Sequence, residues 1–179
     1  MHKQGHFGLG LLSTSVLTLL LLEGGFFLWA PLIGLAGIAG GLTPDIDNKQ
    51  IVPFKHHGWT HTVVFGLFIS AIISGCLFGV FHAAIRLTSG TTFAITSPPL
   101  LGNLALAILL YVGTLAGFLS HLFGDTLSTA GGTLLIRPWK PISNNHVRIG
   151  VTTAGNPVYN LAFFLLGVIS HILPYYVYL

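Results

Sequence analysis

Long apolar runs alternate with short polar segments along the whole chain. A helix crosses the hydrocarbon core of a bilayer, which is about 30 Å thick, with roughly 20 apolar residues. Every Lys, Arg, Asp and Glu residue lies outside the five apolar stretches that reach or approach this length: Phe7–Leu22, Phe26–Leu42, Val63–Ile85, Leu100–Ser120 and Val158–Leu179. The pattern therefore predicts an all-α integral membrane protein, in which a bundle of about five transmembrane helices forms a single membrane domain over residues 1–179.

The composition agrees with a membrane protein and excludes one class of partner. Hydrophobic residues make up 53% of the chain and charged residues only 6%, whereas a soluble domain contains about 25% charged residues. A formal net charge of +3 is too small for a nucleic-acid-binding surface. We therefore expect membrane lipids as the surroundings and no nucleic acid as a partner. The "EGG" segment, Glu23–Gly25, predicts a tight hairpin between the first two helices.

The distribution of basic residues predicts how the helices are oriented in the membrane. If the N-terminus is cytoplasmic, Arg86 is the only one of the seven Lys and Arg residues that falls outside the cell. Because cytoplasmic segments carry an excess of Lys and Arg, this asymmetry favours a cytoplasmic N-terminus and an external C-terminus. We expect a multi-pass protein of the inner, cytoplasmic membrane.

The same orientation groups most of the acidic residues and histidines at one end of the helices. The segments before the first stretch, between the second and third, and at the close of the fourth all fall on the cytoplasmic side. Carboxylates beside a membrane are costly unless they are paired or bound to a cation. The grouping predicts one cytoplasmic metal site, with seven candidate ligands: His6, Asp45, Asp47, His56, His61, His121 and Asp125.

Two spacings within this set suit metal binding. His121 and Asp125 are four residues apart, which places both side chains on one face of a helix. Asp45 and Asp47 flank one residue, so that in an extended chain both would point the same way, and Pro44 ends the second helix before them. Each motif alone has a simpler interpretation, since D-x-D is common in turns and helix caps.

Histidine and aspartate together suit Zn²⁺, with Mn²⁺ as the alternative. Seven candidate donors exceed what one tetrahedral ion needs. We therefore predict two or more divalent ions, with zinc preferred over manganese.

Four motifs, taken together and in order, resemble a known family. They are "GHFGLG" (Gly5–Gly10), "PDID", "HHGWTHT" and "SHLFGDTLSTAG", and they resemble those of the YdjM-type membrane-bound metal-dependent hydrolases from Gly5 to about Gly131. That family is distantly similar to zinc-dependent phospholipase C and the S1/P1-type nucleases. The resemblance implies a metal-dependent hydrolase, with ligands at the positions that match its motifs: His6, Asp45, Asp47, His56, His61, His121 and Asp125.

Two neighbouring histidines compete for one ligand position. Helical spacing favours His57, four residues before His61, over His56. However, Gly58 interrupts the segment and Thr60 is a good N-cap for the third helix, in which case the spacing argument fails. The family pattern, which has arginine where this chain has His57, favours His56 as the ligand. It leaves His57 facing substrate or solvent, as a third candidate catalytic residue beside Asp45 and Asp47.

The implied reaction is hydrolysis by a metal-activated water. A bound divalent ion lowers the pKa of water to about 7, and Asp47 or Asp45 could then orient that water or act as general base. A site at the membrane surface, together with the phospholipase resemblance, favours a phosphoester in a phospholipid or another interfacial substrate.

The cytoplasmic loop, residues 126–156, predicts both a local fold and a contact to phosphate. Two strand-like segments within Gly131–Thr153 flank a Pro/Asn/Ser turn, which is typical of a short β-hairpin. Arg137, Lys140 and Arg148 could bind a substrate phosphate at the bilayer surface. The alternative is that these three residues only set the membrane topology.

Two other functions use the same residue types. A metal or proton transporter also needs His and Asp beside its spans, although its coupling residues lie near the midplane. A non-catalytic membrane protein could use the metal only to hold its helices together, with all four positions of the ion closed. Metal-dependent turnover of a phosphoester, or metal uptake into vesicles, would separate these alternatives.

Overall fold

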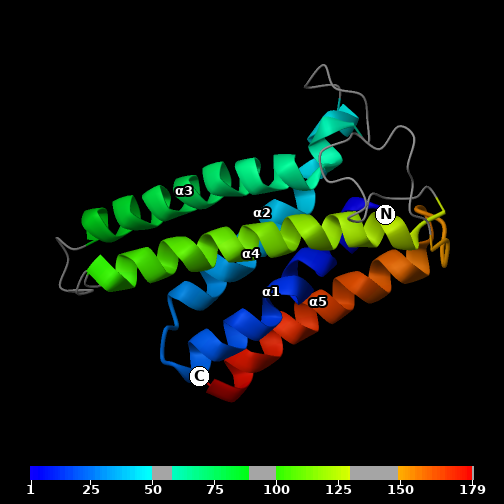
Figure 1. Ribbon diagram of the computed structural model, residues 1–179. Coiled ribbons are helices and arrows are strands. Elements are labelled where there is room, and N and C mark those ends of the chain that lie inside the picture. The colour runs from blue at the N-terminus through cyan, green and yellow to red at the C-terminus, as the bar shows by residue number, and fades with distance from the viewer. Residues whose placement is uncertain (50–57, 89–99, 130–148, 179) are drawn as a thin grey trace.

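The computed structural model describes residues 1–49, 58–88, 100–129 and 149–178, and all of its long elements are helices (Figure 1). This confirms the all-α prediction for the described residues. Within these ranges lie five α-helices and two short 3₁₀ helices: α1 (Lys3–Glu23), α2 (Trp29–Leu42), η1 (Pro44–Lys49), η2 (Trp59–His61), α3 (Val63–Thr88), α4 (Leu100–Leu127) and α5 (Pro157–Tyr178).

Four of the helices, α1, α3, α4 and α5, are long and apolar enough to cross a membrane. The second predicted span is shorter than expected. Helix α2 has 14 residues, or about 21 Å at 1.5 Å per residue, which is less than the thickness of the hydrocarbon core. It packs against α1, α4 and α3, so that its apolar surface is covered largely by protein.

Two helices extend beyond the apolar stretches that predicted them. Helix α1 begins at Lys3 rather than Phe7, and α4 continues to Leu127 rather than ending at Ser120. Both extensions carry polar residues. The apolar stretches were shorter than the helices because apolar character marks only the part of a helix that meets lipid, whereas the hydrogen-bonded backbone continues beyond it. The extensions place His6, His121 and Asp125 on regular helix.

Successive helices run in alternating directions, so that the two chain ends lie at opposite ends of the bundle (Figure 1). The starts of α1, α3 and α5 and the ends of α2 and α4 therefore share one end. This arrangement confirms that the polar segments described here gather at one end, as the alternation of spans predicts.

The turn between α1 and α2 is the tight hairpin that the "EGG" segment predicts. Gly25 has φ of 78°, a conformation that glycine adopts without steric cost. The amide of Phe26 donates to the carbonyl of Leu21 at 2.7 Å, and that of Gly25 donates to Leu22 at 3.0 Å. These two bonds form a Schellman motif, which satisfies the last carbonyls of α1.

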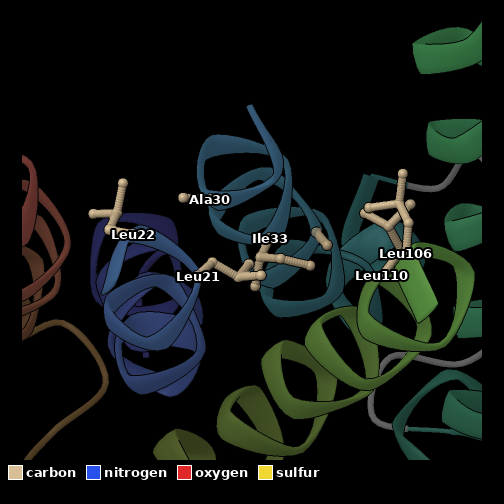
Figure 2. Packing of buried hydrophobic residues seen from close by; sticks show 7 residues of the cluster. Leu21, Leu22, Ala30, Ile33, Leu106 and Leu110 are labelled. Carbon is tan, nitrogen blue, oxygen red and sulfur yellow. The ribbon is translucent and has the colours of Figure 1, made fainter. Parts of the chain in front are cut away.

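The apolar core joins α1, α2 and α4 in the half of the bundle nearer the C-terminus (Figure 2). Leu21 and Leu22 of α1 pack with Ile33 of α2 and Leu110 of α4. Nearer the polar end, glycines bring the same three helices into backbone contact. A Cβ atom at Gly10 or at Gly117 would overlap the carbonyl oxygen of Gly37.

The D-x-D segment is not extended, which corrects the prediction for its backbone. Thr43 keeps helical dihedral angles, φ −67° and ψ −40°, and Pro44 begins the 3₁₀ helix η1. Proline suits the first turn of a helix, where no partner is needed for its missing N–H. At three residues per turn, Asp45 and Asp47 point about 120° apart rather than the same way.

The start of α3 also differs from the prediction. Thr60 lies inside η2, and α3 begins at Val63. The N-cap is Thr62, whose hydroxyl accepts the amide of Phe65 at 3.1 Å, as N-cap threonines do. The hydroxyl of Thr60 is therefore available for the polar cluster.

Residues 149–152, which precede α5, run along the end of α4. The amides of Ile149 and Thr152 donate to the carbonyls of Thr126 and Leu127 at 2.8 and 3.2 Å, and Ser128 forms an isolated parallel bridge with Thr152. These bonds satisfy carbonyls that the helix itself leaves open. The predicted β-hairpin falls mostly on residues 130–148, which lie outside the described residues.

Candidate metal centre

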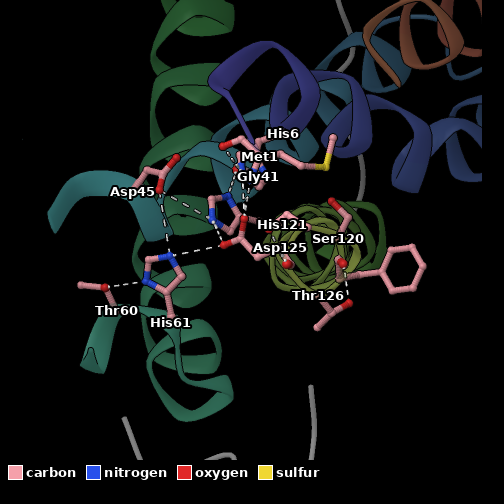
Figure 3. A network of polar contacts seen from close by, with 12 residues as sticks. Met1, His6, Gly41, Asp45, Thr60, His61, Ser120, His121, Asp125 and Thr126 are labelled. Carbon is pink, nitrogen blue, oxygen red and sulfur yellow. Dashed lines mark hydrogen bonds and ion pairs between the residues drawn. The ribbon is translucent and has the colours of Figure 1, made fainter. Parts of the chain in front are cut away.

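Five predicted ligands from four elements converge at the polar end of the bundle (Figure 3). Helix α1 contributes His6 in its first turns, and α4 contributes two residues near its end. The two 3₁₀ helices contribute one residue each. Donor atoms that could hold a metal lie within 4.8 Å of one another in two groups, His6–Asp45–His121 and His61–His121–Asp125.

His121 is oriented for metal binding by a backbone carbonyl. Its Nδ1 lies 2.7 Å from the carbonyl oxygen of Gly41 at the end of α2. A ring that donates from Nδ1 presents a lone pair at Nε2 when it is neutral. This Nε2 is buried and forms no hydrogen bond with any described residue. The arrangement is typical of a metal-binding histidine, whose second nitrogen is fixed by a hydrogen bond.

The Asp125 carboxylate faces histidines on both of its oxygens. Its Oδ1 lies 3.2 Å from Nε2 of His6. Its Oδ2 lies 3.2 Å from Nε2 of His121 and 3.7 Å from Nε2 of His61. Two ligands of one tetrahedral zinc ion are about 3.3 Å apart. Asp125 is therefore placed to share an ion with His61 and His121 through Oδ2, whereas Oδ1 and Nε2 of His6 are also in contact with the Met1 ammonium and carbonyl.

His61 is held from its other nitrogen by the second aspartate of the D-x-D motif. Oδ2 of Asp47 lies 3.4 Å from Nδ1 of His61, and the Thr60 hydroxyl donates to the same carboxylate oxygen. Nε2 of His61 faces Asp125 and Asp45. Asp47 thus lies on the side of the ring away from these carboxylates, where it fixes the orientation of the ring.

Asp45 forms the accessible side of the centre. Its Oδ1 lies 3.8 Å from Nε2 of His121 and 4.0 Å from Nε2 of His61. Its side chain is partly exposed, whereas those of His61 and His121 are fully buried. Asp45 also lines a hollow of about 440 Å³ together with residues of the N-terminal segment. The centre is therefore closed toward the bundle and open beside Asp45.

The chemistry of this donor set fits divalent cations. A neutral His121 Nε2 and the Asp125 carboxylate are both acceptors, and at 3.2 Å they need a cation or a proton between them. Burial makes unpaired carboxylates costly. The α-ammonium of Met1, 2.7 Å from Asp125 Oδ1, offsets only part of the negative charge of the aspartates. Metal ions would complete this balance, because buried charges are stabilised by pairing or by metals.

The remaining predicted residues divide into two kinds. Asp47 belongs to the cluster through His61, outside both groups of donor atoms. The other predictions fall on residues 50–57 and 130–148, outside the described part of the chain: the ligand His56, the catalytic residue His57, and the phosphate-binding residues Arg137, Lys140 and Arg148.

Besides the Met1 ammonium, sequence reasoning missed two contributors to the site. The Gly41 carbonyl orients His121, and no residue type signals a backbone acceptor. The Thr60 hydroxyl contacts Asp47, although this threonine was predicted to cap α3. The Ser128 hydroxyl donates to the backbone carbonyl of Asp125 at 2.9 Å and so stabilises the end of α4.

Substitution of Asp47 by asparagine distinguishes support of a ligand from ligation. Because Asp47 contacts His61 on its Nδ1 side, we expect metal affinity to fall about 10- to 100-fold while the number of ions bound at saturation stays unchanged. Titration against a chelator of known affinity, followed by elemental analysis, measures both quantities. Loss of a whole ion per chain at saturating metal would instead make Asp47 a ligand, as its motif predicts.

Comparison with known proteins identifies a family for nearly the whole chain. Residues 1–177 match the family described as YdjM inner membrane protein. No curated protein and no solved structure matches the chain. The family description and the four long apolar helices together indicate a membrane protein.

Proposed function

Since the chain belongs to the YdjM inner membrane protein family, we propose that it is a membrane-bound metal-dependent hydrolase that cuts a phosphoester in a lipid or another interfacial substrate. The observation that carries the proposal is a buried His/Asp centre that opens at one carboxylate, Asp45, beside a hollow. A metal that only holds helices together has all its positions closed by protein, whereas a catalytic metal keeps one for water or substrate.

The chain's own residues would divide the work as follows. His6, His61, His121 and Asp125 would hold divalent ions, zinc or alternatively manganese, with His61, His121 and Asp125 as one group of donors. Ions bound there would supply an activated water and stabilise negative charge on a phosphoryl group. Asp45, at the open side, is better placed than the buried Asp47 to accept the proton of that water.

The substrate class follows from where the centre lies. It is built at the ends of helices that are apolar enough to cross a membrane, so that a headgroup at the bilayer surface is at the right depth. Arg137, Lys140 and Arg148 add positive charge to the predicted cytoplasmic loop, residues 126–156. We propose that these three residues and His57 contact the phosphate group of the substrate. The proposed similarity to zinc-dependent phospholipase C and nucleases rests on the His and Asp motifs.

The centre would face the cytoplasm. The positive-inside asymmetry, with Arg86 alone at the opposite end, supports this orientation. Membrane vesicles of defined sidedness test it, because a membrane-impermeant phosphoester should reach the centre in inverted vesicles and not in sealed right-side-out vesicles.

The purified protein, reconstituted into vesicles, should hydrolyse a fluorogenic phosphodiester lipid only when metal is bound. We expect a chelator to abolish turnover and added Zn²⁺ or Mn²⁺ to restore it. Asp45→Asn should lower the rate at least about 100-fold, the lower range for loss of a general base, with metal content measured in parallel. Glu23→Gln, at the far end of α1, is the matched control and should keep full activity.

Other outcomes of the same experiment identify the competing functions. Bound metal without turnover of phosphate monoesters or diesters would indicate a structural metal site. Metal accumulation inside the vesicles would indicate a transporter. Either result would overturn the hydrolase proposal.

A further inference from the structure

Two hollows adjoin each other at the polar end of the bundle, and they share Lys3 and Gln4. The larger, about 440 Å³, is lined by Met1, His2, Lys3, Gln4 and Asp45. The smaller, about 180 Å³, is lined by Lys3, Gln4, Phe7, Leu42 and Phe164. Because Lys3 and Gln4 line both hollows, a single ligand could extend from one hollow into the other.

The two hollows differ in chemistry. The larger has polar side chains and leads to the metal centre through Asp45. The exposed lining of the smaller is apolar, and the Phe7 and Phe164 rings face each other across α1 and α5 with centroids 5.7 Å apart. One hollow is therefore suited to a charged group and the other to a hydrocarbon chain.

The order of the two hollows follows the direction of a lipid in a bilayer. Phe7 is one turn further along α1 than Lys3, and Phe164 lies two turns into α5. Both helices run from the polar end into the predicted membrane. The apolar hollow thus lies on the membrane side of the polar one, as the chains of a lipid lie below its headgroup.

We propose that these hollows form one binding site for a phosphorylated lipid. The Lys3 ammonium binds the phosphate beside Asp45, and the first methylene groups of the chain occupy the hollow between Phe7, Leu42 and Phe164. Lysine binds phosphate as a point charge, and burial of each methylene adds to affinity. The inference deepens the proposed hydrolase function and rests on it, because it assigns the substrate's apolar part and adds Lys3 to the residues that select it.

A photoreactive alkyl phosphate tests the site without requiring turnover. The probe carries a diazirine on its chain and is added to the metal-loaded protein in nanodiscs, and labelled peptides are identified by mass spectrometry. We expect adducts on the segments of Leu42 and Phe164. Leu42→Trp, which fills the apolar hollow, should lower labelling about tenfold, the effect of roughly two buried methylene groups. Leu35→Trp, on the exposed side of the same helix, should leave it unchanged.

Further variants and probes separate the contributions of chain and charge. Gln4→Trp places a bulky side chain at an exposed position between the two hollows. It therefore tests whether one ligand occupies both hollows even if Leu42→Trp fails to fold. Lys3→Gln should lower labelling by the alkyl phosphate several-fold and leave the weak labelling by the matching alkyl alcohol unchanged. Displacement by inorganic phosphate, with no dependence on chain length, would show a site for free phosphate and overturn the proposal.

Failure of the inference and failure of the hydrolase function would look different. Turnover of a short, soluble phosphoester without labelling of Leu42 or Phe164 would leave the hydrolase intact and exclude the lipid site. Labelling at these residues without any turnover would keep the binding site and exclude the hydrolase.

Discussion

Alanine at His121 should remove metal from the centre and abolish any hydrolysis that depends on it. His121 is the one residue common to both groups of donor atoms, so whichever group holds the ion loses a ligand. Residues that only support a ligand cost about 10- to 100-fold in metal affinity when replaced. Loss of a direct ligand should therefore lower the metal affinity by more than about 100-fold, and the purified variant should contain less than half of the wild-type metal.

Elemental analysis of detergent-purified protein, prepared without chelators, provides the measurement. His82→Ala is the matched control, because His82 lies on α3 near the opposite end of the bundle and is already hydrogen bonded to Phe78 and Asn103. The control should keep its metal. The double variant His121→Ala, Asp125→Ala should contain no metal while its helical circular dichroism is unchanged. A wild-type protein that neither contains metal nor takes it up on addition would exclude the metal centre altogether.

The placement of His121 beside Asp125 could be predicted from sequence because its geometry is local. A spacing of four residues has a fixed meaning once the segment is helical, and α4 continues as helix through both residues. The gathering of the polar segments at one end likewise follows from the alternation of spans, which leaves few arrangements of the chain. Both results depend on counting residues and not on how side chains pack.

The D-x-D motif shows where such reasoning fails. The prediction assumed an extended chain, and Pro44 instead begins a 3₁₀ helix that separates the directions of Asp45 and Asp47. One carboxylate faces Nε2 of His61 and the other its Nδ1. Two acidic residues separated by a single residue thus have different surroundings, and only their three-dimensional placement decides which could bind metal and which supports a ligand.

Contacts between helices were also beyond prediction, although glycines that permit them are visible in the sequence. Gly10, Gly37 and Gly117 lie each four residues, about one turn, from His6, Gly41 and His121 respectively. Backbone contact at the glycines therefore sets the separation of α1, α2 and α4 one turn away from the centre. Sequence alone does not reveal which glycines face one another.

Substitution of Gly117 by alanine should therefore destabilise the protein and weaken metal binding together. The added Cβ would overlap the Gly37 carbonyl oxygen, and Gly117 has no flexible side chain opposite it that could move aside. Overpacking typically costs about 1–3 kcal/mol, and we expect the upper end here because backbone must shift. Separation of α2 from α4 would also lengthen the 2.7 Å contact between Gly41 and His121.

Thermal unfolding in detergent, with metal affinity measured in parallel, tests this coupling between packing and site. Gly75→Ala on α3 is the matched control, because a Cβ atom there would meet nothing within 4 Å and alanine favours helix by about 1 kcal/mol over glycine. The midpoint temperature of unfolding of Gly75→Ala should stay the same or rise, and its metal affinity should be unchanged. A Gly117→Ala variant as stable as the control would contradict the close approach of the helices. If it lost stability but kept full metal affinity, the glycine contacts would hold the bundle together without setting the geometry of the centre.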